Sequence, residues 1–474
     1  MRDRLRALAA LALAVALAGC TTTPVAPPVL DTPQPTLAQP QQLERWWVLF
    51  DDPVLTGLVE ESLAANLDLQ AAMVRVDLAR ANVLLARSDL YPSVNLEAGV
   101  SRNRSTEIGS QPFPAGMSPS SSSHRVGIAA SYELDLWGKY RSSTRAAQNT
   151  LLASEYARET VRTALVAEVA RVYFSLVAAD AELGLLRDTL RLRTESVGLQ
   201  RDRFEGGVVG MLDLRQAEAE HAAVVAEIAR VERAVGLYES ALAALVGRSP
   251  REVYEPAVSR DSNAKRLLEV PPIAAGLPSG LLERRPDVRR TEAELAAASL
   301  RIDAARADYF PSITLTALLG SESAALRNLF TGPAMVWGIG ASLLQPLFGL
   351  KAIEANVEAQ TVRRREVVLA YRQTVQTAFR ETHDALVVNR TARAALDAQR
   401  VRGERIAEAL ELADMRYRSG YSPYLEVLDS QRQLLAAQTL QIQAARDARI
   451  ALVDLARALG GGWNPESVTL SGAR

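Results

Sequence analysis

The chain has 474 residues, a formal net charge of −1 at pH 7 and one cysteine. The near-neutral charge excludes a bulk electrostatic attraction to nucleic acid, and a lone thiol excludes an internal disulfide. This length leaves room for several domains.

Residues 1–19 have the pattern of an N-terminal targeting segment. A basic start precedes the apolar residues 7–18, a run too short to span a bilayer as a permanent helix. It ends in Leu17-Ala18-Gly19-Cys20, which resembles a lipobox, where the cysteine is lipidated and becomes the new N-terminus. An ordinary secretory signal with an incidental cysteine is the alternative. In the lipoproteins that this segment resembles, a residue other than aspartate after the cysteine, here Thr21, implies the outer membrane.

Residues 20–45 are predicted to form a tether between the lipid and the body of the protein. They are rich in proline, threonine and glutamine, a composition that builds no core and is typical of extended linkers.

The body begins near Trp46, and Asp52-Pro53 is typical of a helix start. One helix is predicted from there to about Leu90, with an apolar seam in which large and small residues alternate. Pro92 ends this helix, because the residue before a proline is pushed out of the helical region.

Two segments with a period of two residues come next, 94–101 and 125–136, separated by a Ser/Pro/Gly-rich loop at 105–123. Each is predicted to be a strand of about ten residues with one apolar and one polar face. A hairpin on a soluble core has this pattern, and so does a hairpin that crosses a membrane.

The segment from Tyr140 to Arg203 contains no proline and carries a coiled-coil seam. As one helix it would be about 95 Å long, so we expect an elongated molecule. The segment from Leu350 to Arg418 is of the same length class and also lacks proline. The seam of the first segment is Leu165, Val169, Val172, Leu176, Ala179, Leu183, Leu186 and Leu190.

The second half of the chain repeats the first. Tyr91-Pro92-Ser93-Val94 recurs as Phe310-Pro311-Ser312-Ile313, and Leu136-Trp137-Gly138 recurs as Leu347-Phe348-Gly349. Each half is predicted to contain a helix, two strands, a very long helix and a last helix. The boundaries are 46–250 for the first repeat, 251–275 for a linker, 276–463 for the second repeat and 464–474 for a tail. The second pair of strands is expected at 313–319 and 337–343.

Four strands cannot close a barrel, and an open strand edge in lipid leaves backbone groups unsatisfied. Several chains must therefore share one barrel, and three chains give twelve strands, wide enough for a channel. The predicted fold is mainly α with a β-barrel portion: a trimeric twelve-stranded membrane barrel, four strands per chain, continued by an α-helical coiled-coil barrel in the periplasm. The residues expected to face the channel are small or polar: Gly127, Ser131, Gly338, Gly340 and Ser342.

Longer motifs resemble the outer membrane factors of tripartite efflux pumps, the TolC-like family, and within it the lipidated OprM-like branch. They are the segments 276–288, 304–313, 132–138 and 416–420, which read GLPSGLLERRPDV, AARADYFPSI, YELDLWG and RYRSG. The resemblance implies a homotrimer in the outer membrane of a Gram-negative bacterium. It also implies docking to a periplasmic adaptor and to an inner-membrane transporter of the resistance-nodulation-division class.

No enzymatic or cofactor-binding pattern is present. The histidines, His124, His221 and His383, are scattered and lie in no metal-ligand spacing. Gly460-Gly461-Gly462 lacks a following phosphate-binding helix and is predicted to stop the last helix. Beyond a covalent lipid on Cys20, no cofactor is expected.

The resemblance places a periplasmic gate at Leu425, Asp429 and Arg432, which share one helical face. Three Asp429 carboxylates around one axis would favour cations; the alternative is an ordinary exposed pair with Arg432. The first repeat has Leu212, Gln216 and Ala219 at the matching places, so the acidic ring is expected from the second repeat only. Tyr417 is expected to help hold neighbouring helices shut.

The turns Gly206-Gly207 and Ser419-Gly420 are expected to mark the periplasmic tips and to contact the adaptor. Alternatively their glycines only permit a tight helix reversal. The sequence thus predicts a passive exit duct for drugs or other small molecules. A protein-export duct of the type I secretion class and a lipid-anchored periplasmic scaffold that never crosses the membrane are the alternatives.

Overall fold

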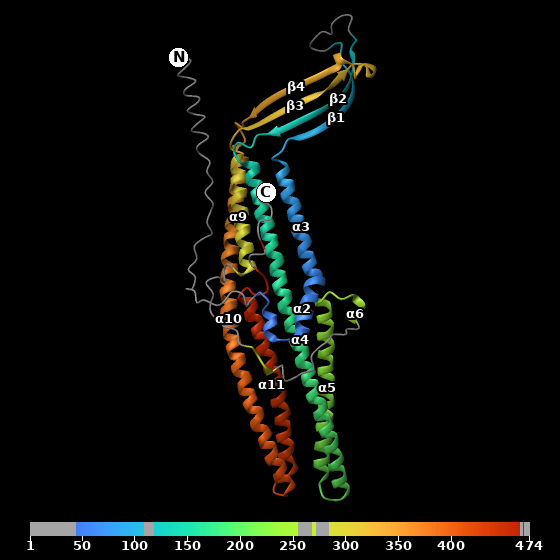
Figure 1. Ribbon diagram of the computed structural model, residues 1–474, viewed down its shortest axis with the longest axis vertical. Coiled ribbons are helices and arrows are strands. Elements are labelled where there is room, and N and C mark those ends of the chain that lie inside the picture. Colours follow the sequence, from blue (N-terminus) through green and yellow to red (C-terminus); the bar gives the residue numbers. More distant parts are fainter. Residues whose placement is uncertain (1–43, 109–117, 255–267, 272–283, 465–467, 469–474) are drawn as a thin grey trace, which may run out of the picture.

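The computed structural model describes residues 44–108, 118–254, 268–271, 284–464 and 468. The predicted signal peptide, Cys20 and all of the tether before residue 44 lie outside the described residues, as do residues 276–283 of the family motif. The molecule is elongated, with a sheet at one end and the turns of two long helical hairpins at the other (Figure 1). Among the described helices, none is long and apolar enough to cross a membrane.

The elements recur in the predicted order, which confirms the duplicated unit. The first repeat contains η2 (Trp46–Phe50), α2 (Pro53–Ala65), α3 (Leu67–Ser88), β1 (Ser93–Arg104), β2 (Ser120–Glu133), α4 (Lys139–Glu205), α5 (Met211–Leu245) and α6 (Pro250–Tyr254). The second contains α9 (Pro286–Ala307), β3 (Ser312–Ser323), η3 (Leu326–Asn328), η4 (Gly332–Ala334), β4 (Met335–Leu344), α10 (Leu350–Arg418) and α11 (Tyr424–Ala458).

The prediction of one continuous helix from Pro53 to Leu90 is wrong, because the chain breaks it at Asn66. This residue has extended dihedral angles, φ −63° and ψ 130°, and its side chain accepts a hydrogen bond from the backbone N–H of Leu69. It therefore caps a new helix, α3, as asparagine commonly does. Its Nδ2 also donates to the carbonyl oxygen of Leu245, at the end of α5, over 2.9 Å.

Gly247 explains why the break falls there. Its φ is +76°, and a Cβ at this position would lie 2.3 Å from the carbonyl oxygen of Ala65. Only a glycine permits this approach, which packs the turn after α5 against the end of α2. Asn66 and Gly247 together form what we call the first joint.

The second repeat has an equivalent joint built from different side chains. Arg285 lies 219 residues after Asn66 and precedes α9, and its Nη1 donates to the carbonyl oxygen of Ala458 at the end of α11 (3.4 Å). Gly460, with φ +77°, lies where a Cβ would come within 2.8 Å of the carbonyl oxygen of Arg284. We call Arg285 and Gly460 the second joint.

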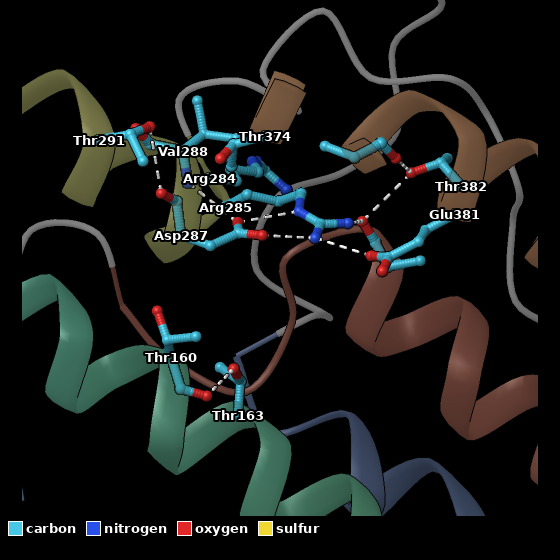
Figure 2. A network of polar contacts seen from close by, with 12 residues as sticks. Thr160, Thr163, Arg284, Arg285, Asp287, Val288, Thr291, Thr374, Glu381 and Thr382 are labelled. Atoms are coloured by element: carbon cyan, nitrogen blue, oxygen red, sulfur yellow. Dashed lines mark hydrogen bonds and ion pairs between the residues drawn. The ribbon is translucent and has the colours of Figure 1, made fainter. Parts of the chain in front are cut away.

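The second joint differs from the first in that it is charged. Figure 2 shows the buried Arg285 guanidinium between Asp287 and Glu381, with Nη2 at 2.6 Å and 2.8 Å from their carboxylate oxygens. Thr382 donates to the same Ala458 carbonyl over 3.2 Å. One cation therefore links the start of α9, the middle of α10 and the end of α11.

The four strands form one antiparallel sheet in the order β1-β2-β3-β4. All four predicted strands are confirmed, with shifted ends. β2 begins at Ser120, inside the predicted loop, and ends at Glu133, so Leu134 and Leu136 lie beyond it. It ends there because the Asp135 carboxylate accepts hydrogen bonds from the backbone N–H groups of Tyr140 and Arg141, the first turn of α4.

The strand register sorts side chains onto two faces. One row across the sheet pairs Leu96 with Ile128, Leu319 and Trp337, all at least half exposed. The other face carries rows such as Ser131, Thr316 and Gly340. The five residues predicted to face the channel all lie on this second face.

The helical core is centred on the predicted seam of α4. Six of its eight residues are buried, and Val172 and Leu190 are partly buried against the same cluster. The N-terminal turn contributes Trp46, Trp47 and Phe50 to that core, all buried. Gly460 ends α11, as predicted, and Trp463 donates from Nε1 to the carbonyl oxygen of Arg284 (2.8 Å).

Candidate functional site

The turns that join α4 to α5 and α10 to α11 are at the end of the molecule opposite the sheet (Figure 1). We call residues 206–210 the first tip and 419–423 the second tip. Gly207 (φ +72°) and Gly420 (φ +77°) are left-handed, and the N–H of the next residue in each case donates back to the helix, Val208 to Arg203 and Tyr421 to Arg416. Both tips thus use the same glycine-dependent helix ending, with Gly206 and Ser419 as the C-caps.

The two tips have different surfaces. The first exposes the apolar Val208, at 74%, next to Leu212, at 69%, in the first turn of α5. The second exposes the aromatic Tyr421, at 82%, next to Arg416 and Arg418 in the last turn of α10. A partner that contacts both tips would therefore meet two chemically distinct surfaces.

The predicted gate residues lie in the first turns of α11. Leu425 is half exposed, and Asp429 is exposed and accepts a hydrogen bond from Gln433 Nε2 (2.6 Å). The structure does not form the simple Asp429–Arg432 pair that was the alternative interpretation. Arg432 instead donates from Nε and Nη2 to Glu220 on α5, over 2.8 Å and 2.5 Å.

Arg193 extends this contact between the hairpins. Its side chain on α4 is buried, donates to Gln431 on α11, and lies 3.8 Å from the Glu220 carboxylate. Burial lowers the pKa of Arg193, opposed by the charge of Glu220. Glu220 therefore lies between two arginines from different hairpins.

Tyr417 makes a second connection between the hairpins, closer to the tips. Its hydroxyl oxygen accepts a hydrogen bond from Arg203 Nη1 on α4 (2.6 Å), and its ring lies 5.6 Å from that of Tyr424. The Tyr424 hydroxyl in turn lies 2.8 Å from Ser196 Oγ on α4. Tyr417 and, among the predicted gate side chains, Arg432 are thus part of the interface between the two hairpins.

The sequence interpretation missed Arg193, Arg203 and Glu220. A signal existed for Arg193, because it continues the α4 seam three residues after Leu190. A polar residue at a seam position must find a buried partner. For Arg203 and Glu220 no such signal exists, since only helix packing decides which hairpin they meet.

The three histidines lie in β2, α5 and α10. Within the described residues, no cluster of His, Cys, Asp and Glu is arranged to hold a metal ion.

A sheet with one apolar and one polar face, continued by two helices, α4 and α10, of 67 and 69 residues and so about 100 Å long each, is typical of the class of elongated membrane channels. The model of the outer membrane efflux protein family matches residues 58–248 and 277–461. The toluene efflux pump outer membrane protein TtgC of Pseudomonas putida is 36% identical over 460 residues, covering 94% of this chain and 93% of TtgC. The probable outer membrane lipoprotein SilC of Salmonella typhimurium is 32% identical over 418 residues, 88% of each chain.

Among solved structures, the CmeC outer membrane channel of Campylobacter jejuni superposes with a TM-score of 0.83. It is 26% identical, and the match covers 93% of this chain and 95% of CmeC. The chain belongs to the outer membrane efflux protein family. It is an efflux channel of the outer membrane rather than an enzyme, as the sequence predicted.

Proposed function

We propose that three copies of this chain form a passive exit duct for small molecules, closed at the periplasmic tips and opened there by partner proteins. The observation that carries the proposal is the open four-stranded sheet. β1 and β4 each have a free edge in the single chain, and unpaired backbone groups in lipid cost several kcal/mol each. Pairing β1 of one copy with β4 of the next removes every edge, and three copies give twelve strands.

The separation of apolar and polar side chains onto the two faces of the sheet supports a closed barrel. The apolar rows, including the half-exposed Ile128 and the 70% exposed Trp337, would face lipid. The rows of glycine, serine and threonine would line the channel. The same threefold arrangement brings three copies of each hairpin together as a helical tube below the barrel.

The proposed partner proteins are inferred from the exposed helix turns at the two tips and from the named functions of related proteins. TtgC is named as the outer membrane protein of a toluene efflux pump, which supports small-molecule export over protein export. We infer a periplasmic adaptor at Gly206, Gly207, Ser419 and Gly420, and an inner-membrane transporter of the resistance-nodulation-division class that supplies the energy. SilC is named as a probable lipoprotein, which supports lipidation of Cys20.

The gate would consist of Leu425, Asp429 and Arg432, with Tyr417 holding the hairpins together. Asp429 is exposed on α11, and its carboxylate has no arginine partner within the described residues. Three such carboxylates around the axis would repel one another and favour cations. The contacts of Tyr417 with Arg203 and of Arg432 with Glu220 would stabilise the closed mouth.

Single-channel conductance of the purified full-length trimer in planar bilayers tests the duct and the gate together. Wild type is expected to give small, cation-preferring currents, and Asp429→Asn should lower the cation preference by roughly twofold or more. Asp213→Asn is the matched control, because it removes the same charge from the first turn of α5 on the other hairpin.

If wild type and Asp429→Asn had equal ion selectivity, the hypothesis of an acidic ring would be contradicted, but the proposal of a duct would stand. Folded wild-type protein that stays monomeric and conducts no ions would contradict the duct itself and favour the periplasmic scaffold.

A further inference from the structure

The charged residues of the sheet are sorted between its two faces. The described strands contain three acidic residues, Glu97, Glu133 and Glu322, and the register places all of them on the polar face. Arg102, Arg104 and His124 lie on the opposite face, in line with Val94, Leu96 and Val100. The face that we assign to lipid therefore carries two arginines, a histidine and no carboxylate in the described strands.

These three basic residues lie at the end of the sheet far from the helices. Along β1 the apolar positions end at Val100, opposite His124, and the next two positions on the same face are Arg102 and Arg104. With about 3.3 Å per residue and a tilt near 40°, Arg102 lies about 20 Å and Arg104 about 25 Å above Val94. An apolar band about 25 Å tall covers the membrane interior in barrels of this kind, so both guanidinium groups fall at its outer border.

The residues around them form a polar patch. Arg102 pairs with Ser122, Arg104 with Ser120, and His124 with Val100 and Ser323. Arg102 is exposed and makes no ion pair within the described part of the chain, whereas Arg104 Nη2 lies 3.1 Å from Glu107 Oε1 with both side chains more than half exposed. His124 Nδ1 is buried and has no hydrogen-bond partner there. We call Arg102, Arg104, His124, Ser120 and Ser122 the outer basic patch.

We propose that the outer basic patch binds the phosphorylated headgroup of a glycolipid in the outer leaflet of the outer membrane. The guanidinium fork matches phosphate oxygens in a bidentate manner, and the serine hydroxyls provide donors and acceptors for sugar hydroxyls. An exposed pair such as Arg104–Glu107 contributes little and is easily exchanged for a phosphate. This inference rests on the proposed duct, because only a closed barrel turns this face toward lipid.

Arg125 provides the matched control. It neighbours His124 in β2 but points to the polar face, where its Nη2 lies 2.7 Å from Glu322 Oε2. Substituting it removes one positive charge, as each single substitution in the patch does, at nearly the same height and without touching the membrane face.

The experiment measures binding of defined lipids to the purified full-length trimer in detergent, by native mass spectrometry. The probes are bisphosphorylated lipid A, lipid A from which both phosphates have been removed, and phosphatidylglycerol. Wild type should prefer the bisphosphorylated form to both others. The double variant Arg102→Ser, Arg104→Ser should lose about tenfold in affinity for it. The variant Arg102→Lys, Arg104→Lys keeps the charge but not the bidentate fork, so its affinity should lie between those of wild type and the double serine variant. Arg125→Ser should bind as wild type does.

Equal binding of the phosphorylated and dephosphorylated forms would overturn the proposal, and so would equal binding of phosphatidylglycerol, since the patch would then lack glycolipid specificity. If Arg125→Ser lost as much affinity per removed charge as the double variant does, net charge alone would explain the effect, and the proposal would be overturned as well. Conductance of the same preparation separates the two proposals. Channels without lipid preference refute the patch alone, whereas a protein that forms no channel refutes the duct and the patch with it.

Discussion

The two repeats share a backbone plan but fix it with different side chains. At the first joint, the neutral Asn66 reaches the carbonyl oxygen of Leu245; at the second, Arg285 reaches that of Ala458, 213 residues further on. Arg285 brings two carboxylates with it, those of Asp287 and Glu381. The comparison teaches that a duplicated fold keeps the position of a contact, the end of the last helix, while its chemistry diverges.

At both ends of its last helix, in the gate positions and in the joint residue, the second repeat is the more polar of the two. The gate residues proposed above are on α11, whose far end the charged joint holds, whereas the matching positions on α5 are Leu212, Gln216 and Ala219. The hairpin with the more polar mouth is therefore also the one whose joint residue, Arg285, is itself charged. In the first repeat the ion pair is beside the joint, between Arg248 and Glu61 (3.2 Å).

Replacing the joint glycines should have the largest effect, because both repeats depend on them. In Gly247→Ala the new Cβ would lie 2.3 Å from the Ala65 carbonyl oxygen, and in Gly460→Ala it would lie 2.8 Å from that of Arg284. Alanine would also be strained by the left-handed φ at both positions. We therefore expect each substitution to lower the free energy of unfolding by about 3 kcal/mol or more, and Gly247→Ala to have the larger effect. The apparent melting temperature of the purified protein measures this.

Gly57→Ala is the control for the glycine substitutions. Gly57 is in α2, and a Cβ added to it would meet no other atom within 4 Å. Alanine should therefore stabilise the protein by about 0.5–1 kcal/mol and raise its melting temperature slightly. Joint variants that melt as wild type does would show that the close approach in the joints is not required.

The charged joint should be the more costly of the two to break. Arg285→Met leaves Asp287 and Glu381 partly buried without their cation, at a cost of about 3 kcal/mol. Asn66→Ala loses a cap and one neutral hydrogen bond, at a cost of about 1–2 kcal/mol. The melting temperature of Arg285→Met should therefore be lower than that of Asn66→Ala. Adding Glu381→Gln to Arg285→Met should recover part of the lost stability, because it removes one of the two unpaired carboxylates. The reverse order would mean that the ion pairs contribute no net stability.

The repeats also differ where the sheet meets the long helix, and this difference depends on pH. Tyr140 donates to Glu133 Oε2 over 2.9 Å; burial and then this hydrogen bond raise its pKa from 10.0 to about 12. The matching residue of the second repeat is Lys351.

Because the folded protein holds the Tyr140 proton more tightly than the unfolded chain does, its contribution is complete below pH 10 and is lost as the pH rises through 12. Tyr140 is only partly buried, so screening limits that contribution to about 1 kcal/mol. Melting curves between pH 9 and pH 12 should show the advantage of wild type over Tyr140→Phe shrinking to nothing. Parallel curves for the two proteins would be evidence against the raised pKa.

The smallest expected effect is at the interface between the hairpins. A double-mutant cycle with Arg432→Met and Glu220→Gln should give a coupling of about 0.5–1 kcal/mol, because the arginine is half exposed. Tyr417→Phe, which removes the acceptor of Arg203, is expected to raise the open probability of the channel in bilayers. A coupling near zero, with unchanged gating in Tyr417→Phe, would show that these contacts do not hold the mouth closed.

Periodic patterns that extend over many residues could be predicted from the sequence. The bounds of α10, Leu350 to Arg418, and the four strands follow from proline positions and from the switch between periods of 3.5 and 2. Such patterns extend over many residues, so local sequence specifies them. The exposed position of Asp429 on α11 also follows from helical spacing.

The break at Asn66 could not be predicted in the same way. The seam continues through it, from Leu58 and Ser62 to Leu69, and no glycine or proline interrupts the helix there. The cause is 179 residues away, in the carbonyl oxygen of Leu245 and in Gly247. Likewise, nothing near Arg432 indicates that its partner is Glu220 on the other hairpin rather than Asp429.

The sequence by itself determined the periodic parts of this protein: the duplicated unit, the long helices, the two-faced strands and the membership of a channel family. Only the tertiary structure decided where side chains from distant segments meet, at the two joints, at the hairpin interface and in the outer basic patch. The physical reason is that periodicity fixes which face of an element a residue occupies, whereas the partner on that face depends on how elements pack and on the strand register.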